Sequence, residues 1–128
     1  MEATHGEMVV KRHPGAVAEV RGFVRLTLGG WGMDDYVPCL VATELVTNAI
    51  RYGGTADDDV TLRLVLAEGG ALWLEVQDTT CDLPHIPELD LTSESGRGLL
   101  IVERFTRRWG VRPLAGDRGK VVFAVVEP

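Results

Sequence analysis

The chain has 128 residues, a formal net charge of −6 and a pI near 5.0, with 45% hydrophobic and 25% charged residues. This length suits one domain, residues 1–128, with its own core, and the composition is that of a globular protein. The acidic charge argues against non-specific binding to nucleic acid or to an anionic membrane. A phosphate ligand would have to be held by local backbone groups, a metal ion or a few arginines.

The sequence predicts a cytoplasmic protein with no segment in the membrane. The N-terminus has no apolar core of a signal peptide, and no apolar run approaches the roughly 18 residues of a membrane span. Cys39 and Cys81 lie far apart without metal-binding spacing, which is typical of reduced thiols in a cytosolic protein. The histidines are scattered and form no metal-binding pattern.

The first part of the chain predicts a strand and a helix after a loose terminus at residues 1–6. Residues 7–12 are expected to form a short strand. Pro14 then opens a helix, a position where its missing N–H does no harm, and Gly29-Gly30 end it. One face of this helix carries regularly spaced apolar residues, Val17, Val20, Val24 and Leu28.

A second helix is expected at about residues 36–52, capped by Asp34 or Asp35 and stopped by Gly53-Gly54. Glu44 and Asn48 lie four residues apart, on the same side as its apolar stripe. Polar groups in a core-facing stripe are costly unless something pairs with them. The two side chains could hold a divalent cation and a water, or they could simply bond to each other.

The remainder predicts a β-hairpin, a long irregular segment, a third helix and two further strands. Gly69-Gly70 joins two alternating strands, and the polar loop before them is expected to be a solvated turn. The element order is β-α-α-β-β-α-β-β, which predicts an α+β two-layer sandwich: a mostly antiparallel mixed sheet with three helices on one face. The expected ranges are 53–59 for the polar loop, 60–66 and 71–78 for the hairpin, 79–95 for the irregular segment, 99–107 for the helix, and 109–114 and 121–126 for the last strands.

Two further features carry possible chemistry. Asp78 ends a buried strand, where a carboxylate can accept a hydrogen bond from an exocyclic amine such as that of adenine, or can begin a turn. Residues 95–99, Ser-Gly-Arg-Gly-Leu, precede a helix, where backbone N–H groups can bind an anion and glycines let phosphate approach. The P-loop pattern is absent, since residues 116–121 have the wrong spacing and lack its hydroxyl.

Taken in chain order, these features resemble the Bergerat-fold ATPases, the superfamily of gyrase, Hsp90 chaperones, mismatch-repair ATPases and histidine kinases. Residues 44–53 resemble the N-box of that superfamily. Asp78 stands at the first glycine-box position, and residues 95–99 resemble the second glycine box. The resemblance spans about residues 14–127.

Within that superfamily, the chain is most similar to the small anti-sigma-factor serine kinases of actinomycete type. The likeness includes Trp31-Gly32 before the N-box and Arg108-Trp109-Gly110 after the glycine box. It implies an ATP- and Mg²⁺-dependent regulator that sequesters a sigma factor and phosphorylates an anti-anti-sigma protein on serine. It also implies a homodimer formed through the first helix and a sheet edge.

The resemblance implies roles for individual residues. Glu44 would be the catalytic base or water-orienting carboxylate, Asn48 would coordinate Mg²⁺ bridging the ATP phosphates, and Asp78 would bind the adenine amine. Residues 83–95 would form a lid over the triphosphate, to which Arg97 adds charge. The implied cofactor-binding residues are Asn48, Asp78, Thr80, Gly96, Arg97, Gly98 and Leu99.

Two positions depart from the superfamily pattern. Thr80 replaces the glycine of the usual D-x-G sequence, which would stiffen the adenine loop or narrow the site. Val121 replaces an expected threonine beside Gly119-Lys120, which would remove a hydroxyl near the adenine-bound water. Both changes are compatible with weak ATP affinity. Two alternatives therefore remain: a non-catalytic module whose partner affinity is gated by nucleotide, and a histidine-kinase catalytic domain acting in trans.

Overall fold

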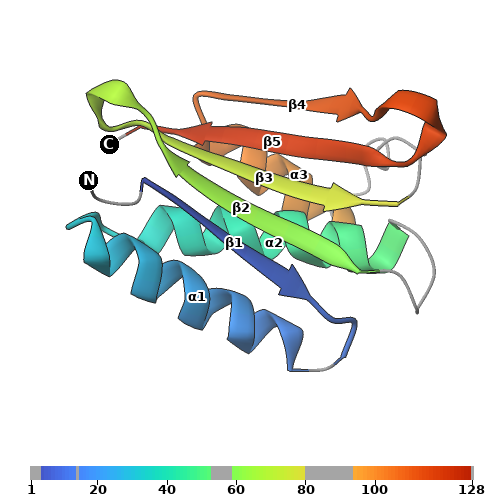
Figure 1. Ribbon diagram of the computed structural model, residues 1–128, viewed down its shortest axis with the longest axis horizontal. Helices are drawn as coiled ribbons and strands as arrows, with labels where there is room; N and C mark the ends of the chain where they lie inside the picture. The colour runs from blue at the N-terminus through green and yellow to red at the C-terminus, as the bar shows by residue number, and fades with distance from the viewer. Residues whose placement is uncertain (1–3, 14, 53–58, 80–93, 128) are drawn as a thin grey trace.

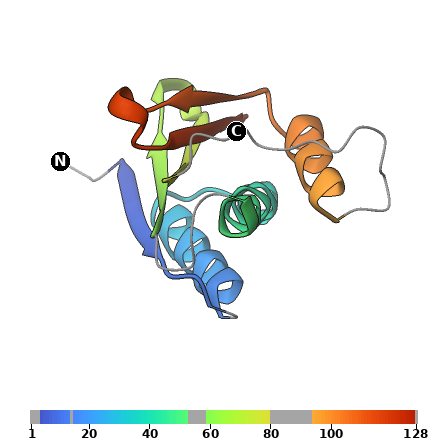
Figure 2. The same cartoon turned by 90° about the vertical axis from the view of Figure 1, so that its right-hand side faces the viewer.

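The computed structural model describes residues 4–13, 15–52, 59–79 and 94–127. They form one open five-stranded sheet with the strand order β1-β2-β3-β5-β4 (Figure 1). The three helices of these ranges lie on one side of the sheet (Figure 2). None of them combines the length and the apolar character that crossing a bilayer requires. The elements are β1 (His5–Val10), α1 (Ala16–Gly30), α2 (Tyr36–Tyr52), β2 (Val60–Leu66), β3 (Leu72–Asp78), α3 (Glu94–Phe105), β4 (Arg108–Pro113) and β5 (Lys120–Val126), with short 3-10 turns at Glu68–Gly70 and Ala115–Asp117.

The α+β architecture and the predicted order of elements are confirmed. The sheet was expected to be mostly antiparallel, and every strand pairing in the described ranges is antiparallel. Alternate residues of each strand face the helices, because successive side chains point to opposite sides of a sheet. The helix-facing residues of the strands pack against α1 to form part of the core. They are small and medium apolar side chains, among them Val20, Val24, Leu28, Leu62, Leu64, Leu72, Leu74, Val76 and Ala124.

The helix α2 has the predicted bounds, and the reason is local. The backbone N–H of Tyr36 donates to Asp34 Oδ1 at 3.1 Å, so Asp34 caps the helix as expected. The predicted turn at Gly69-Gly70 is also confirmed, since both residues have positive φ, 86° and 88°. The expected stop at Gly53-Gly54 lies outside the described residues.

Several predicted boundaries are wrong. The strand β1 begins at His5 and ends at Val10, because it pairs along the whole of β2 and the N–H of Leu66 reaches the carbonyl of Thr4. The helix α1, by contrast, ends with Gly29-Gly30 as predicted. The helix α3 begins at Glu94, so the Gly96-Arg97-Gly98 stretch lies within its first turns instead of preceding it. Glycine disfavours a helix by only about 1 kcal/mol, which packing can outweigh.

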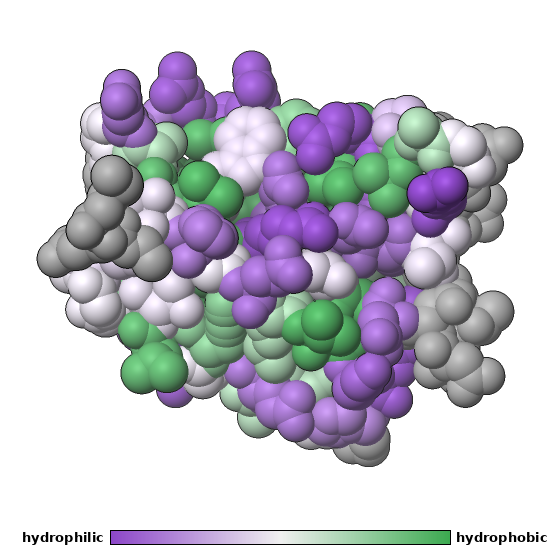
Figure 3. Space-filling view, in the orientation of Figure 1, coloured by the Kyte–Doolittle hydropathy of each residue, from purple (hydrophilic) through white to green (hydrophobic). Residues whose placement is uncertain are grey.

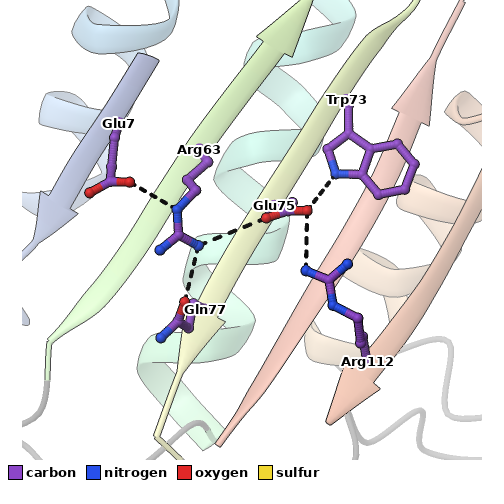
Figure 4. Close-up of polar contacts among 6 residues, drawn as sticks. All are labelled: Glu7, Arg63, Trp73, Glu75, Gln77 and Arg112. Atoms are coloured by element: carbon purple, nitrogen blue, oxygen red, sulfur yellow. Dashed lines mark hydrogen bonds and ion pairs between the residues drawn. The ribbon is translucent and has the colours of Figure 1, made fainter. Parts of the chain in front are cut away.

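The face of the sheet opposite the helices carries a polar network. Hydrophilic residues gather across the middle of this face (Figure 3). Glu75 lies at the centre: its carboxylate accepts a hydrogen bond from Trp73 Nε1 at 2.7 Å and lies 3.4 Å from Arg112 Nη2 (Figure 4). Arg63 joins it from β2, with Nη1 3.8 Å from Glu75 and Nε donating to Glu7 at 2.9 Å. Side chains from four strands are thereby tied together.

Candidate functional site

The helix α2 presents Glu44 and Asn48 on one side, both half-buried, next to the fully packed Leu45 and Ala49. A second feature holds this end of the helix in place. The guanidinium of Arg12 donates to the carbonyl oxygens of Ile50 at 2.6 Å and Ala49 at 3.3 Å. These carbonyls belong to the last turns of α2, where helix carbonyls lack partners within the helix and favour a cation.

Asp78 is the last residue of β3, and it is 2% exposed. It pairs in register with Lys120, the first residue of β5, and both side chains lie on the face covered by the helices. Lys120 Nζ lies 2.9 Å from each carboxylate oxygen of Asp78. Among the described residues, these are the charged side chains that are buried, and the structure pairs them with each other.

The pairing of β3 with β5 corrects one expectation from the sequence. Val121 was expected to stand near the adenine end of the site, but its register partners are Gln77 and Arg112, on the opposite side of the sheet. A shift of one residue along a strand moves a side chain to the other face. Lys120 is therefore the β5 side chain that meets Asp78.

These elements converge at one end of the fold. The C-terminal ends of α2 and β3 and the N-terminal ends of α3 and β5 all lie on the right in Figure 1, and α2 packs against both β3 and α3. The arrangement brings Asn48 and Asp78 to the same end as the glycine stretch of α3. The backbone of residues 96–99, which are Gly96, Arg97, Gly98 and Leu99, forms part of the first turns of α3. Thr80 and the predicted lid up to residue 93 lie outside the described residues.

A cavity of about 520 Å³ lies at the opposite end of the fold. The start of α2 and the ends of β2 and β5 line it, together with Trp31 and Met33 of the α1–α2 connection. Among the described residues, none that was predicted to act on a ligand lines this cavity. It is therefore separate from the site formed by α2, β3 and α3.

Comparisons with known proteins agree with this geometry. Residues 34–126 match the family described as histidine kinase-, DNA gyrase B- and HSP90-like ATPase. The match covers more than half of the chain, which therefore belongs to this ATPase family and is an ATP-binding domain by class. No curated protein sequence gives a significant match.

Among solved structures, the fold is similar to the histidine kinase domain of the blue-light activated histidine kinase EL346 from Erythrobacter litoralis. The two share 22% sequence identity with a TM-score of 0.51. The similarity covers 70% of this chain and 42% of the kinase domain. The present chain thus matches less than half of that structure, and the similarity concerns the fold.

The described residues fit a nucleotide with a divalent cation, with one exception. Carboxylate and carboxamide oxygens, as on Glu44 and Asn48, suit Mg²⁺. A buried acceptor such as Asp78, at the end of a strand, suits an exocyclic amine. The exception is that the carboxylate of Asp78 already has a buried ammonium as its partner. A nucleobase therefore meets an ion pair rather than a lone carboxylate.

Sequence reasoning missed both Lys120 and Arg12. One sequence feature could have indicated Lys120: it stands directly after a glycine and begins an otherwise apolar strand, so its side chain could lie in the core. Arg12 follows the first strand, and nothing in the sequence joins it to residues 49 and 50. Both contacts link residues far apart in the chain, so only the fold reveals them.

Proposed function

We propose that this protein is an anti-sigma factor with ATP- and Mg²⁺-dependent serine kinase activity toward an anti-anti-sigma protein. The observation that carries the proposal is the convergence of α2, the end of β3 and the start of α3 at one end of the fold. It supports the proposal because Asn48 lies in the C-terminal half of α2, one turn after Glu44, and β3 ends at Asp78. The finer assignment is supported by the resemblance of residues 31–32 and 108–110 to the small anti-sigma kinases.

In this proposal each residue has a distinct task. Asn48 holds the metal ion with its amide oxygen, and Glu44 accepts the proton of the attacking serine hydroxyl or orients that hydroxyl. The backbone N–H of Gly96, in the first turn of α3, donates to a phosphate oxygen, Gly98 lets phosphate approach the helix, and Arg97 adds positive charge. When bound, Mg²⁺-ATP supplies the phosphoryl group and neutralises charge on its phosphates.

The direct test is to incubate the protein with labelled ATP, Mg²⁺ and a candidate anti-anti-sigma protein. Glu44→Gln should lower phosphotransfer by about a hundredfold or more, the usual contribution of a general base, while nucleotide binding changes only a few-fold. Glu68→Gln is the matched control, because Glu68 lies in the exposed turn after β2. Equal phosphotransfer by Glu44→Gln and the wild type would contradict the proposal.

The same experiment separates the two alternatives. Sigma-factor binding without any transfer would favour a nucleotide-gated binding module. A phosphorylated partner whose label is lost in acid would favour histidine phosphorylation, because phosphohistidine is acid-labile and phosphoserine is not. Cross-linking at several protein concentrations tests the proposed homodimer.

A further inference from the structure

The ion pair between Asp78 and Lys120 is held by the fold rather than by chance side-chain contact. The two residues are register partners of adjacent antiparallel strands. Their side chains are 1% and 5% exposed, and Nζ lies 2.9 Å from both carboxylate oxygens. Gly119, with φ of 130°, brings the backbone before Lys120 against the carbonyl of Asp78. A buried donor thus lies directly beside a buried acceptor.

The chemistry of this pair decides how a base can bind. A neutral exocyclic amine is a weaker partner for a buried carboxylate than an ammonium is, because charge-assisted hydrogen bonds are roughly twice as strong as neutral ones. The amine of a base therefore does not displace Lys120. It can still bind beside it, since each carboxylate oxygen accepts more than one hydrogen bond and an ammonium carries three N–H donors.

We propose that Asp78 and Lys120 recognise the nucleobase together, with Lys120 as a specificity-determining residue. Asp78 accepts an N–H from the exocyclic amine, and Lys120 donates to the adjacent ring nitrogen while keeping its ion pair. The Watson–Crick edge of adenine offers this neighbouring pair, the 6-amino group and N1. The inference rests on the proposed nucleotide site, and it assigns to Lys120 a base contact that the sequence did not predict.

The test compares ATP with 1-deaza-ATP, in which a C–H replaces N1, by calorimetry in the presence of Mg²⁺. The wild type should bind 1-deaza-ATP about tenfold or more weakly, the usual effect of losing a hydrogen bond to a charged group. Lys120→Met should bind the two nucleotides equally. Lys11→Met is the matched control, because Lys11 forms an exposed ion pair with Asp59 at 2.8 Å, and it should discriminate like the wild type.

A second measurement needs no variant. Lys11 and Lys120 are the only lysines in the sequence, so selective ¹⁵N-lysine labelling gives one side-chain signal for each. ATP should shift the Lys120 Nζ signal and leave that of Lys11 in place, whereas 1-deaza-ATP should shift Lys120 much less. 7-Deaza-ATP, which lacks a ring nitrogen on another edge, should act like ATP.

The outcomes separate this inference from the proposed function. Equal binding of ATP and 1-deaza-ATP by the wild type, with an unshifted Lys120 signal, would overturn the role of Lys120 and leave the nucleotide site intact. Absence of binding by every adenine nucleotide would instead overturn the proposed function itself. Unfolding curves of Lys120→Met, recorded beside those of Lys11→Met, establish that the variant is folded.

Discussion

Gly119 lies so close to the main chain of Asp78 that no side chain fits between them. A Cβ on Gly119 would overlap the Asp78 carbonyl oxygen and come within 2.9 Å of the Cα of Thr79. The φ of Gly119, 130°, is also one that residues with a side chain rarely adopt. Gly119 therefore allows the start of β5 to approach the end of β3, where the buried ion pair forms.

We expect Gly119→Ala to lower the free energy of unfolding by about 1–3 kcal/mol from backbone strain alone, and the overlap adds to this cost. Urea denaturation measures the change. Gly22→Ala is the control, because Gly22 lies within α1 and its Cβ would have no atom within 4 Å. That variant should gain about 0.5–1 kcal/mol, the usual preference of a helix for alanine. Similar losses in both variants would contradict the role of Gly119.

Glu75 should contribute more to the stability of the folded protein than the more exposed Glu7 does. Glu75 is 15% exposed and accepts from Trp73 and Arg112, whereas the 53% exposed Glu7 pairs with Arg63. Glu75→Ala leaves the partly buried Trp73 N–H without its acceptor and removes the partner of the exposed Arg112, so we expect a loss of about 1–3 kcal/mol in urea denaturation. Glu7→Ala should cost at most about 1 kcal/mol, as is usual for a surface ion pair. Equal costs would mean that the network contributes nothing beyond its surface charges.

The fold could be predicted from the sequence where local signals decide. The start of α2 was predicted correctly because the signals that set it, the capping Asp34 and the apolar periodicity, are local features. The β2–β3 hairpin follows from Gly69-Gly70 in the same way. The predicted start of α3 was wrong because Gly96 and Gly98 disfavour a helix locally, whereas α3 is also stabilised by its packing on α2, which no local signal shows.

The candidate site could be predicted only in part, for a different reason. Glu44, Asn48 and Asp78 stand out as polar residues within apolar elements. The partner of Asp78 lies 42 residues away, and its identity depends on the register of β3 against β5. Lys120 and Val121 are consecutive and lie on opposite faces of the sheet, so only the register shows which of them meets Asp78.

Cys39 should be an unreactive thiol in the folded protein. It is 9% exposed, and its Sγ lies 3.9 Å from the carbonyl oxygen of Arg21 on α1. Burial raises the pKa of Cys39, and the negative charge of Asp35 raises it further. Since the thiolate is the nucleophile, alkylation should be slower in the folded than in the unfolded protein.

The pH dependence of that difference has a definite sign. A raised pKa means that the folded protein holds the proton to higher pH than the unfolded chain does, so the difference in thiolate content is largest between the two pKa values. It shrinks as the pH rises above the raised pKa of Cys39. Iodoacetamide labelling of a Cys81→Ser variant, with and without urea, measures it by mass spectrometry. Equal rates at pH 8 would contradict the burial of this thiol.

Arg12 should stabilise the C-terminal turns of α2, which carry Asn48. Its guanidinium bonds the carbonyls of Ala49 and Ile50, directly after Asn48. Arg12→Met keeps the apolar stem but removes these charged hydrogen bonds. We expect the free energy of unfolding to fall by about 1–2 kcal/mol, because hydrogen bonds to charged groups contribute less when they are only partly buried. The more specific effect is local, because the last carbonyls of the helix lose their cation.

Hydrogen exchange of the amides of residues 48–52 measures that local effect. These amides should exchange faster in Arg12→Met than in the wild type, and Mg²⁺-nucleotide affinity should fall with them, since Asn48 lies on the loosened turn. Lys11→Met is the control, because the adjacent Lys11 has a 66% exposed side chain paired with Asp59. Should the amides of both variants exchange at the wild-type rate, the guanidinium would not be holding the helix end. The position of Asn48 would then depend on the packing of α2 alone.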